Sequence, residues 1–154
     1  MTALASGASV YGQDFPPSQY DQDWTTQANL TNITYSTGSP LVAVTCVAPS
    51  SGNILVCLGA GTKIDTASVE RVEVTYHVFR DSADGILIQS AFDNYGVKSA
   101  GPNAISQYQY QGNFSLVTGL VPGTAYYFEV VHRTIGGTGD ANISSRSILT
   151  IPVP

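Results

Sequence analysis

Two histidines are the only side chains in this sequence whose ordinary pKa suits a general base near neutral pH. His77 and His132 both fall in stretches that alternate like β-strands, whereas catalytic groups lie mostly in loops. Nucleophilic catalysis also needs a serine or cysteine beside such a base, and the sequence has no G-x-S-x-G motif. We therefore expect His77 on a polar strand face, at the surface or at an interface. We expect His132 to be a packed, hydrogen-bonded imidazole.

Carboxylates could supply a second kind of chemistry, because glycoside hydrolysis uses two of them on either side of the scissile bond. Asp81, Asp84, Asp93 and Asp140 all fall in predicted turns, where Asp is favoured for its backbone hydrogen bonds alone. The stretch "DSADG" lacks the ligand series of an EF-hand, and "GGTGD" lacks the helix and Lys-Ser/Thr pair of a phosphate-binding loop. The sequence predicts no enzyme, no cofactor and no metal site.

Two cysteines flank the stretch "VAPSSGNILV". If residues 50–53 form a hairpin turn, Cys46 and Cys57 lie opposite each other on adjacent strands, close enough for a disulfide. The alternative is a pair of small buried hydrophobic residues, which suits a chain without an export signal. Both interpretations stay open at this point.

Tyrosines give the sequence a surface that could bind a partner. Tyr108 and Tyr110 share one face of "QYQYQ", and glutamines occupy the other face. Tyrosine packs in cores, anchors protein interfaces and stacks on sugar rings. Together with His77, these two tyrosines are the candidate residues for an interface between copies of the chain.

Charge and composition limit the partners. The chain has six Lys and Arg against eleven Asp and Glu, a net charge of −5, and only 11% charged residues. The basic residues form no run, so we expect no nucleic acid partner. No apolar run reaches the roughly 20 residues of a membrane span, and the N-terminus lacks the pattern of a signal peptide. So few charges indicate that much of the surface is covered by neighbouring molecules.

Residues 1–28 differ from the rest, and we expect them to form an extended N-terminal arm ahead of a domain at 29–154. The segment has paired prolines and no hydrophobic periodicity. Its aromatic residues Phe15, Tyr20 and Trp24 are unfavourable in a free tail. They could pack on the arm's own domain, or they could bind another subunit.

The remaining sequence reads as short strands separated by turns. The clearest is 67–81, where Val72, Val74, Tyr76 and Val78 share one face. The "VPGT" turn at 121–124 provides a glycine where φ may be positive. No segment has a helical apolar stripe. We expect an all-β fold, an antiparallel β-sandwich, with strands near 29–36, 40–49, 54–61, 67–81, 86–92, 104–111, 113–120, 125–133 and 144–153.

Two motifs carry a family resemblance. "TCVAPSSGNILVCLGAGTK" and "SLVTGLVPGTAYYFEVVHRTIGGTG" resemble, in the same order, recurring segments of small jelly-roll virion proteins of bacteriophages, especially those of actinobacteria. More remotely, the layout is similar to the trimeric complement-head and tumour necrosis factor-like domains. The resemblance covers about residues 29–154 and implies a jelly roll that forms homotrimers on virions and performs no catalysis.

The same stretch "GLVPGTAYYFEVV" is also similar to the end of fibronectin type III domains. That module needs a core tryptophan, whereas the one Trp here is Trp24 in the arm, and its usual length is shorter than this β-region. A carbohydrate-binding jelly roll is the third alternative for the fold.

The resemblance implies a capsid decoration or cement protein, found in the virion after assembly in the host cytoplasm. Its partners would be other copies of itself and the major capsid protein. The alternative is a minor tail or tail-fibre protein that recognises a host-surface glycan.

Overall fold

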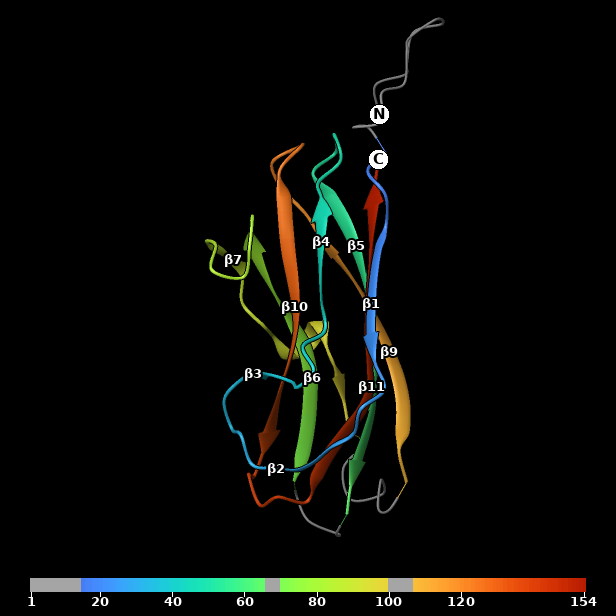
Figure 1. The fold of residues 1–154 in the computed structure, drawn as a ribbon, viewed down its shortest axis with the longest axis vertical. Helices are drawn as coiled ribbons and strands as arrows, with labels where there is room; N and C mark the ends of the chain where they lie inside the picture. Colours follow the sequence, from blue (N-terminus) through green and yellow to red (C-terminus); the bar gives the residue numbers. More distant parts are fainter. Residues whose placement is uncertain (1–14, 66–69, 100–106) are drawn as a thin grey trace, which may run out of the picture.

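The computed structural model describes residues 15–65, 70–99 and 107–154. Strands dominate these residues, and they form two antiparallel sheets packed face to face (Figure 1). The expected all-β sandwich is confirmed. Residues 1–14 of the expected arm, and residues 67–69 and 104–106 of two expected strands, lie outside the described residues.

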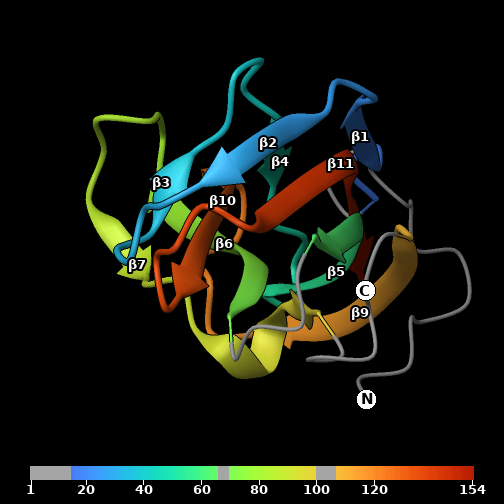
Figure 2. The same cartoon turned by 90° about the horizontal axis from the view of Figure 1, so that it is seen from below.

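We call the first layer sheet A. Its strand order is β1 (Gln19–Asp23), β11 (Ala141–Val153), β5 (Asn53–Ile64) and β9 (Gln109–Val117), and β2 (Gln27–Leu30) also pairs with β11. Figure 2 shows these strands side by side along one flank of the molecule. The order places the first described strand and the last one next to each other.

The second layer is sheet B. Its strand order is β3 (Ser36–Thr37), β10 (Ala125–Ile135), β6 (Arg71–Arg80) and β7 (Leu87–Gln89). In addition, β4 (Ala43–Val47) pairs with β10, and β8 (Val97–Lys98) pairs with β6. A short 3-10 helix, η2 (Asp93–Tyr95), precedes β8.

The long strands alternate between the sheets as the chain proceeds: β4 in sheet B, β5 in A, β6 in B, β9 in A, β10 in B and β11 in A. This repeated crossing is the topology of a jelly roll, in which two Greek keys close over a single core. The expected turn residue Gly123 has φ of 76°, so the "VPGT" stretch makes the tight turn before β10 that its glycine predicts.

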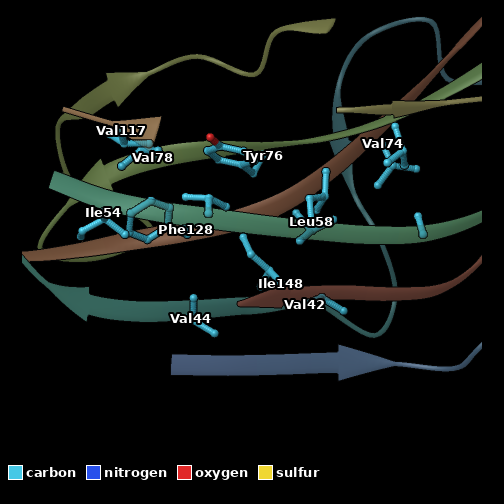
Figure 3. Close-up of a cluster of buried hydrophobic side chains, with 14 of the residues drawn as sticks. Val42, Val44, Ile54, Leu58, Val74, Tyr76, Val78, Val117, Phe128 and Ile148 are labelled. Atoms are coloured by element: carbon cyan, nitrogen blue, oxygen red, sulfur yellow. The ribbon is translucent and has the colours of Figure 1, made fainter. Parts of the chain in front are cut away.

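The core lies between the sheets, where apolar side chains recur at every second position (Figure 3). The four residues predicted to share a face of β6 are all fully buried. Tyr76 packs against Phe128 with ring centroids 6.3 Å apart, and its hydroxyl bonds Ser115 of sheet A at 2.5 Å. A tyrosine in the core therefore also links the two layers.

Several strand boundaries differ from those expected. The expected strand at 29–36 is mostly irregular, with β2 and β3 at its two ends. The expected strands at 104–111 and 113–120 are one strand, β9, which runs through Gly112 because that glycine keeps its pairing with Gly59. Within the expected arm, Pro16 and Pro17 precede the ladder, which begins at Gln19.

The predicted hairpin that would pair Cys46 with Cys57 does not form. The turn at 50–53 does form, with the Gly52 amide bonded to the Pro49 carbonyl, but it carries the chain from β4 in sheet B to β5 in sheet A. Cys46 therefore faces the core, whereas Cys57 lies half-buried on the outer face of sheet A, and both are free thiols. The apolar residues around the turn produced a hairpin-like pattern because both strands border the core.

Candidate assembly interface

The outer face of sheet A carries a continuous set of apolar side chains. Cross-strand pairing aligns Tyr20 with Leu149, Leu149 with Cys57, and Cys57 with Phe114, so one row crosses all four strands. A second row joins Ile151, Leu55 and Leu116 in the same way. We call these residues, with Tyr110, the assembly face: Tyr20, Leu55, Cys57, Tyr110, Phe114, Leu116, Leu149 and Ile151.

The assembly face is unusually exposed for apolar side chains. Phe114 is 71% exposed, Tyr110 66%, Tyr20 57% and Leu116 52%. Large aromatic side chains each have roughly 150–250 Å² to bury, so the contiguous apolar area is on the order of several hundred Å². Patches of that size on a folded domain mark sites of contact with another molecule.

The assembly face also carries no charge. In the described residues, the four strands that build it contain only Asp21, Asp23, Lys63 and Arg146 as charged residues. Arg146 is 1% exposed, and both aspartates bond groups on the inner side of β1. Lys63 pairs with Asp65 at the far end of β5. A neutral apolar face of this kind is suited to burial against protein rather than against nucleic acid.

Glycine allows Tyr110 to lie flat on the sheet. Tyr110 pairs with Gly61, and a Cβ on Gly61 would lie 2.8 Å from the Tyr110 ring. Beyond it, Tyr108 precedes β9, with its ring 6.4 Å from that of Tyr110 and with the Lys63 ammonium 5.5 Å from its centroid. The two tyrosines are therefore neighbours, but only Tyr110 is largely exposed on the face.

Strand β1, from the expected arm, belongs to this sheet. Its backbone pairs with β11 from Gln19 to Asp23. Its inward carboxylates replace the usual apolar contacts: Asp21 accepts a hydrogen bond from the Ala43 amide of sheet B, at 2.9 Å. Asp23 accepts one from Arg146 at 2.5 Å. Of the two alternatives for the arm, β1 and β2 follow the first, because both pack on the arm's own domain by pairing with β11.

His132 is packed as expected, but its hydrogen bonding differs. The side chain is 3% exposed and faces the core at the end of β10, and its Nδ1 has no hydrogen-bond partner among the described residues. Burial, and then the nearby Arg146 guanidinium, lower its pKa to about 4. The expected hydrogen-bonded imidazole is therefore wrong at Nδ1, and the nearby guanidinium repels a protonated imidazole. His132 is therefore neutral at pH 7 and almost fully buried.

His77 lies on the outer face of sheet B, opposite the assembly face. Its Nδ1 accepts a hydrogen bond from the Ala91 amide at 2.9 Å, and its ring packs near Tyr35 and Phe79. Burial lowers the pKa of His77. The structure therefore does not bring His77 together with Tyr110.

Two carboxylates do meet on sheet B. Arg133 donates to Glu73 and to Asp93, both at 2.8 Å, and Tyr35 donates to Asp93 at 2.6 Å. Lys98 lies 3.7 Å from Glu73 and 3.6 Å from Asp93. The hydrogen bond from Tyr35, together with the two cations, holds the pKa of Asp93 below its usual value. Both carboxylates are occupied by cations and hydrogen-bond donors, which suits a structural network.

The other predicted residues are dispersed. Phe15 and Trp24 are 56% and 69% exposed and lie before and after β1 in the sequence, whereas Tyr20 lies within β1 and belongs to the assembly face. The sequence-based prediction missed Phe114 and Leu116, although their alternation with polar residues in "GNFSLV" was a usable signal. It also missed Arg146, because a single arginine in a strand gives no sign of burial.

No group of three or more potential metal-ligating side chains occurs in the described ranges 15–65, 70–99 and 107–154. Within those same residues, no helix is long and apolar enough to cross a membrane.

No family model matches the chain, and no curated protein matches it in sequence. Solved structures do share its fold. An infectious bursal disease virus structure, of the Gx strain, aligns over 88% of this chain with a TM-score of 0.51 and 11% identity. The capsid asymmetric unit of cyanophage Pam1 aligns over 99% of this chain and 94% of its own, with a TM-score of 0.40 and 15% identity. The Eiger tumour necrosis factor of S. frugiperda aligns over 91% of this chain and 94% of its own, with a TM-score of 0.47 and 10% identity.

The chain spans about a third of the length of the bursal disease virus chains, 32% in the Gx strain. At these identities the likeness concerns the fold. Viral capsid structures and a tumour necrosis factor are thus among the structural neighbours, whereas no finding assigns the chain to an actinobacteriophage family.

Proposed function

We propose that this protein is a structural component of a phage virion, a decoration or cement protein that forms a homotrimer and binds the capsid surface. The single observation that carries this proposal is the assembly face: a neutral, apolar, exposed face on a sheet without a catalytic group. Its fold, which a bursal disease virus structure shares, is in keeping with a virion role. The protein performs no catalysis in this proposal.

Electrostatics favour another copy of the chain as the occupant of the assembly face. Each chain has a net charge of −5, and the charges of its described residues lie largely on sheet B and at the ends of the sandwich. Contact between two copies through those surfaces would bring carboxylates together, whereas the assembly face carries no charge that would repel its own copy. Burial of about 800 Å² per partner is typical of a stable interface. Half-buried residues such as Leu149 and Ile151 would add to the area that the exposed aromatic rings bury at this interface.

The arm supplies the contact with the capsid. Phe15 and Trp24 remain exposed on the chain and are free to insert into a neighbouring surface. A truncation that tests this contact must spare β1, because removal of residues 19–23 would uncover the edge of β11 and leave Arg146 without its carboxylate. Deletion of residues 1–18 together with Trp24→Ser removes both aromatic contacts and preserves β1.

The test is reconstitution on virions that carry this protein. We expect the wild-type protein to be present in hundreds of copies per particle by quantitative mass spectrometry, and to rebind particles from which it has been stripped. The arm variant should fold and assemble normally but fail to rebind, whereas a matched Thr45→Ser variant, at an exposed site on sheet B, should rebind like the wild type. A handful of copies per particle would instead support the tail and glycan-recognition alternative. Absence from virions would overturn both.

A further inference from the structure

Strand β1 gives the assembly face its outermost apolar side chain. Tyr20 continues the row formed by Leu149, Cys57 and Phe114. It lies on β1, which comes first in the sequence among the four strands of this row. β1 is an edge strand of five residues that pairs with β11 on one side only. Its position therefore depends on what its inward side chains bind.

The inner side of β1 is held by a buried cation. Arg146 is 1% exposed, and its Nη2 donates to Asp23 at 2.5 Å and to the Pro40 carbonyl at 2.8 Å. Its Nε and Nη1 have no hydrogen-bond partner among the described residues. Asp23 is thus the carboxylate that compensates this charge, and a buried guanidinium without a counter-charge is strongly unfavourable.

Among the described residues, Asp23 is the carboxylate that pairs with Arg146. β11 contributes Arg146 as its one charged residue, and β4 contributes only the Cys46 thiol. From β10, His132 lies near Arg146, and Tyr127 lies near both Asp21 and Glu129. Asp21, the other acid of β1, already accepts the Ala43 amide.

We propose that the Asp23–Arg146 pair is an acid-sensitive latch that positions β1, and with it Tyr20, in the assembly face. Arg146 is a positioning residue for an interface that it does not touch. The part of this inference that concerns Tyr20 rests on the proposed self-assembly, whereas the latch itself concerns the single chain.

Lowering the pH weakens the latch through two groups, Asp23 and His132. Burial would raise the pKa of Asp23, but hydrogen bonds from Thr25 and the Arg146 guanidinium outweigh it and hold this pKa below its ordinary value. The ion pair is therefore complete at neutral pH and is lost as the pH falls through that lowered pKa. His132, with a pKa of about 4, gains a positive charge beside Arg146 in the same acidic range. Both changes leave positive charge buried and uncompensated, which releases β1.

Hydrogen–deuterium exchange of the full chain tests the latch directly. We expect the amides of residues 19–23 to be protected at neutral pH and, in a series at decreasing pH, to exchange at least about tenfold faster once the pH is below the lowered pKa of Asp23, after correction for the intrinsic pH dependence of exchange. The amides of β5 and β10 should stay protected in the same sample. This difference separates release of β1 from acid unfolding of the whole domain.

Three variants assign the effect. Asp23→Asn keeps the shape of the side chain but removes its charge, so residues 19–23 should exchange rapidly already at neutral pH and show no further acid response. Tyr20→Ala should weaken self-assembly without altering the protection of β1. Asp65→Asn, which removes the carboxylate of the exposed Lys63–Asp65 pair, is the matched control and should change neither.

Protection of residues 19–23 that persists in acid, or an Asp23→Asn protein that keeps both protection and acid response, would overturn the latch. A wild-type protein that stays monomeric at neutral pH but releases β1 in acid would refute the proposed self-assembly and the role of Tyr20. It would leave the latch intact, so the two failures are distinguishable.

Discussion

Asp23 and Arg146 are 123 positions apart in the chain, yet the carboxylate and the guanidinium lie 2.5 Å from each other. This ion pair ties the first described strand to the last at the edge of the sandwich, with Arg146 almost fully buried and Asp23 nearly so. Through this ion pair, β1 is held in sheet A although its sequence has no hydrophobic periodicity.

Removal of this carboxylate should destabilise the fold. Asp23→Ala leaves a buried guanidinium unpaired, and we expect its free energy of unfolding to fall by about 3–5 kcal/mol at neutral pH. Asp65→Asn breaks the exposed Lys63–Asp65 pair, keeps an oxygen that can accept the hydrogen bond from Asn142, and should cost less than about 1 kcal/mol. Urea denaturation of both variants measures the difference, and equal losses would contradict the structural role of Asp23.

Two glycines should respond oppositely to the same substitution. A Cβ on Gly38 would lie 1.5 Å from the Arg146 guanidinium, so Gly38→Ala must displace the buried cation and should cost several kcal/mol. A Cβ on Gly112 would meet only the Leu58 carbonyl, at 3.5 Å, and Gly112→Ala should be neutral or stabilising by about 0.5 kcal/mol. Thermal unfolding gives both values, and a tolerated Gly38→Ala would show that Arg146 can relocate without penalty.

The buried imidazole should make stability depend on pH. Because the pKa of His132 is about 4 in the folded chain and 6.5 when unperturbed, the unfolded state binds the proton first as the pH falls. Its contribution to stability is complete above pH 6.5 and decreases toward pH 4, by on the order of 3 kcal/mol.

His132→Leu should therefore flatten the profile of unfolding free energy against pH in this range. His77→Leu removes a half-buried imidazole on the outer face of the same sheet and should have a smaller effect. A His132→Leu profile parallel to that of the wild type would show that folding does not lower the pKa of the imidazole.

The two cysteines should differ in their reactivity. Burial raises the pKa of both thiols, but Cys57 lies on the assembly face and Cys46 in the core, 1% exposed. We expect a maleimide to modify Cys57 in dilute monomer and to modify it at least about tenfold more slowly in the assembled protein. Cys46, the internal control, should react only after denaturation. Intact-mass spectrometry follows both, and a Cys57 rate that does not vary with protein concentration would count against burial of this face.

The general architecture could be predicted because the long strands carry their own pattern. In β6 from Val72 to Val78, and in β10 from Tyr126 to Val130, every second residue is a buried hydrophobic residue, and the "VPGT" turn needs a positive φ that glycine provides. The cysteine hairpin failed for a physical reason: two consecutive strands that border one core look alike whether they pair or face each other across it.

The site was less accessible to sequence reasoning. Tyr110 was recognised from its alternation with glutamines, and Tyr20 was noticed as an aromatic residue that needs a partner. Strand β1 was not recognised, because Asp21 and Asp23 occupy its inward positions and their partners, Ala43 and Arg146, lie far away in the sequence. His77 was grouped with the tyrosines although the topology places it on the opposite sheet.

The most direct test of the central claim is the mass of the protein in solution after Phe114→Lys, which places a charge in the middle of the assembly face. Ile86→Lys is the matched control, since Ile86 is 65% exposed but lies beside β7 in sheet B. By sedimentation velocity at micromolar concentration and neutral pH, we predict that the wild type and the Ile86→Lys protein have three times the mass of one chain. The Phe114→Lys protein should be a folded monomer. A wild-type monomer, or a Phe114→Lys protein that assembles like the wild type, would contradict the account.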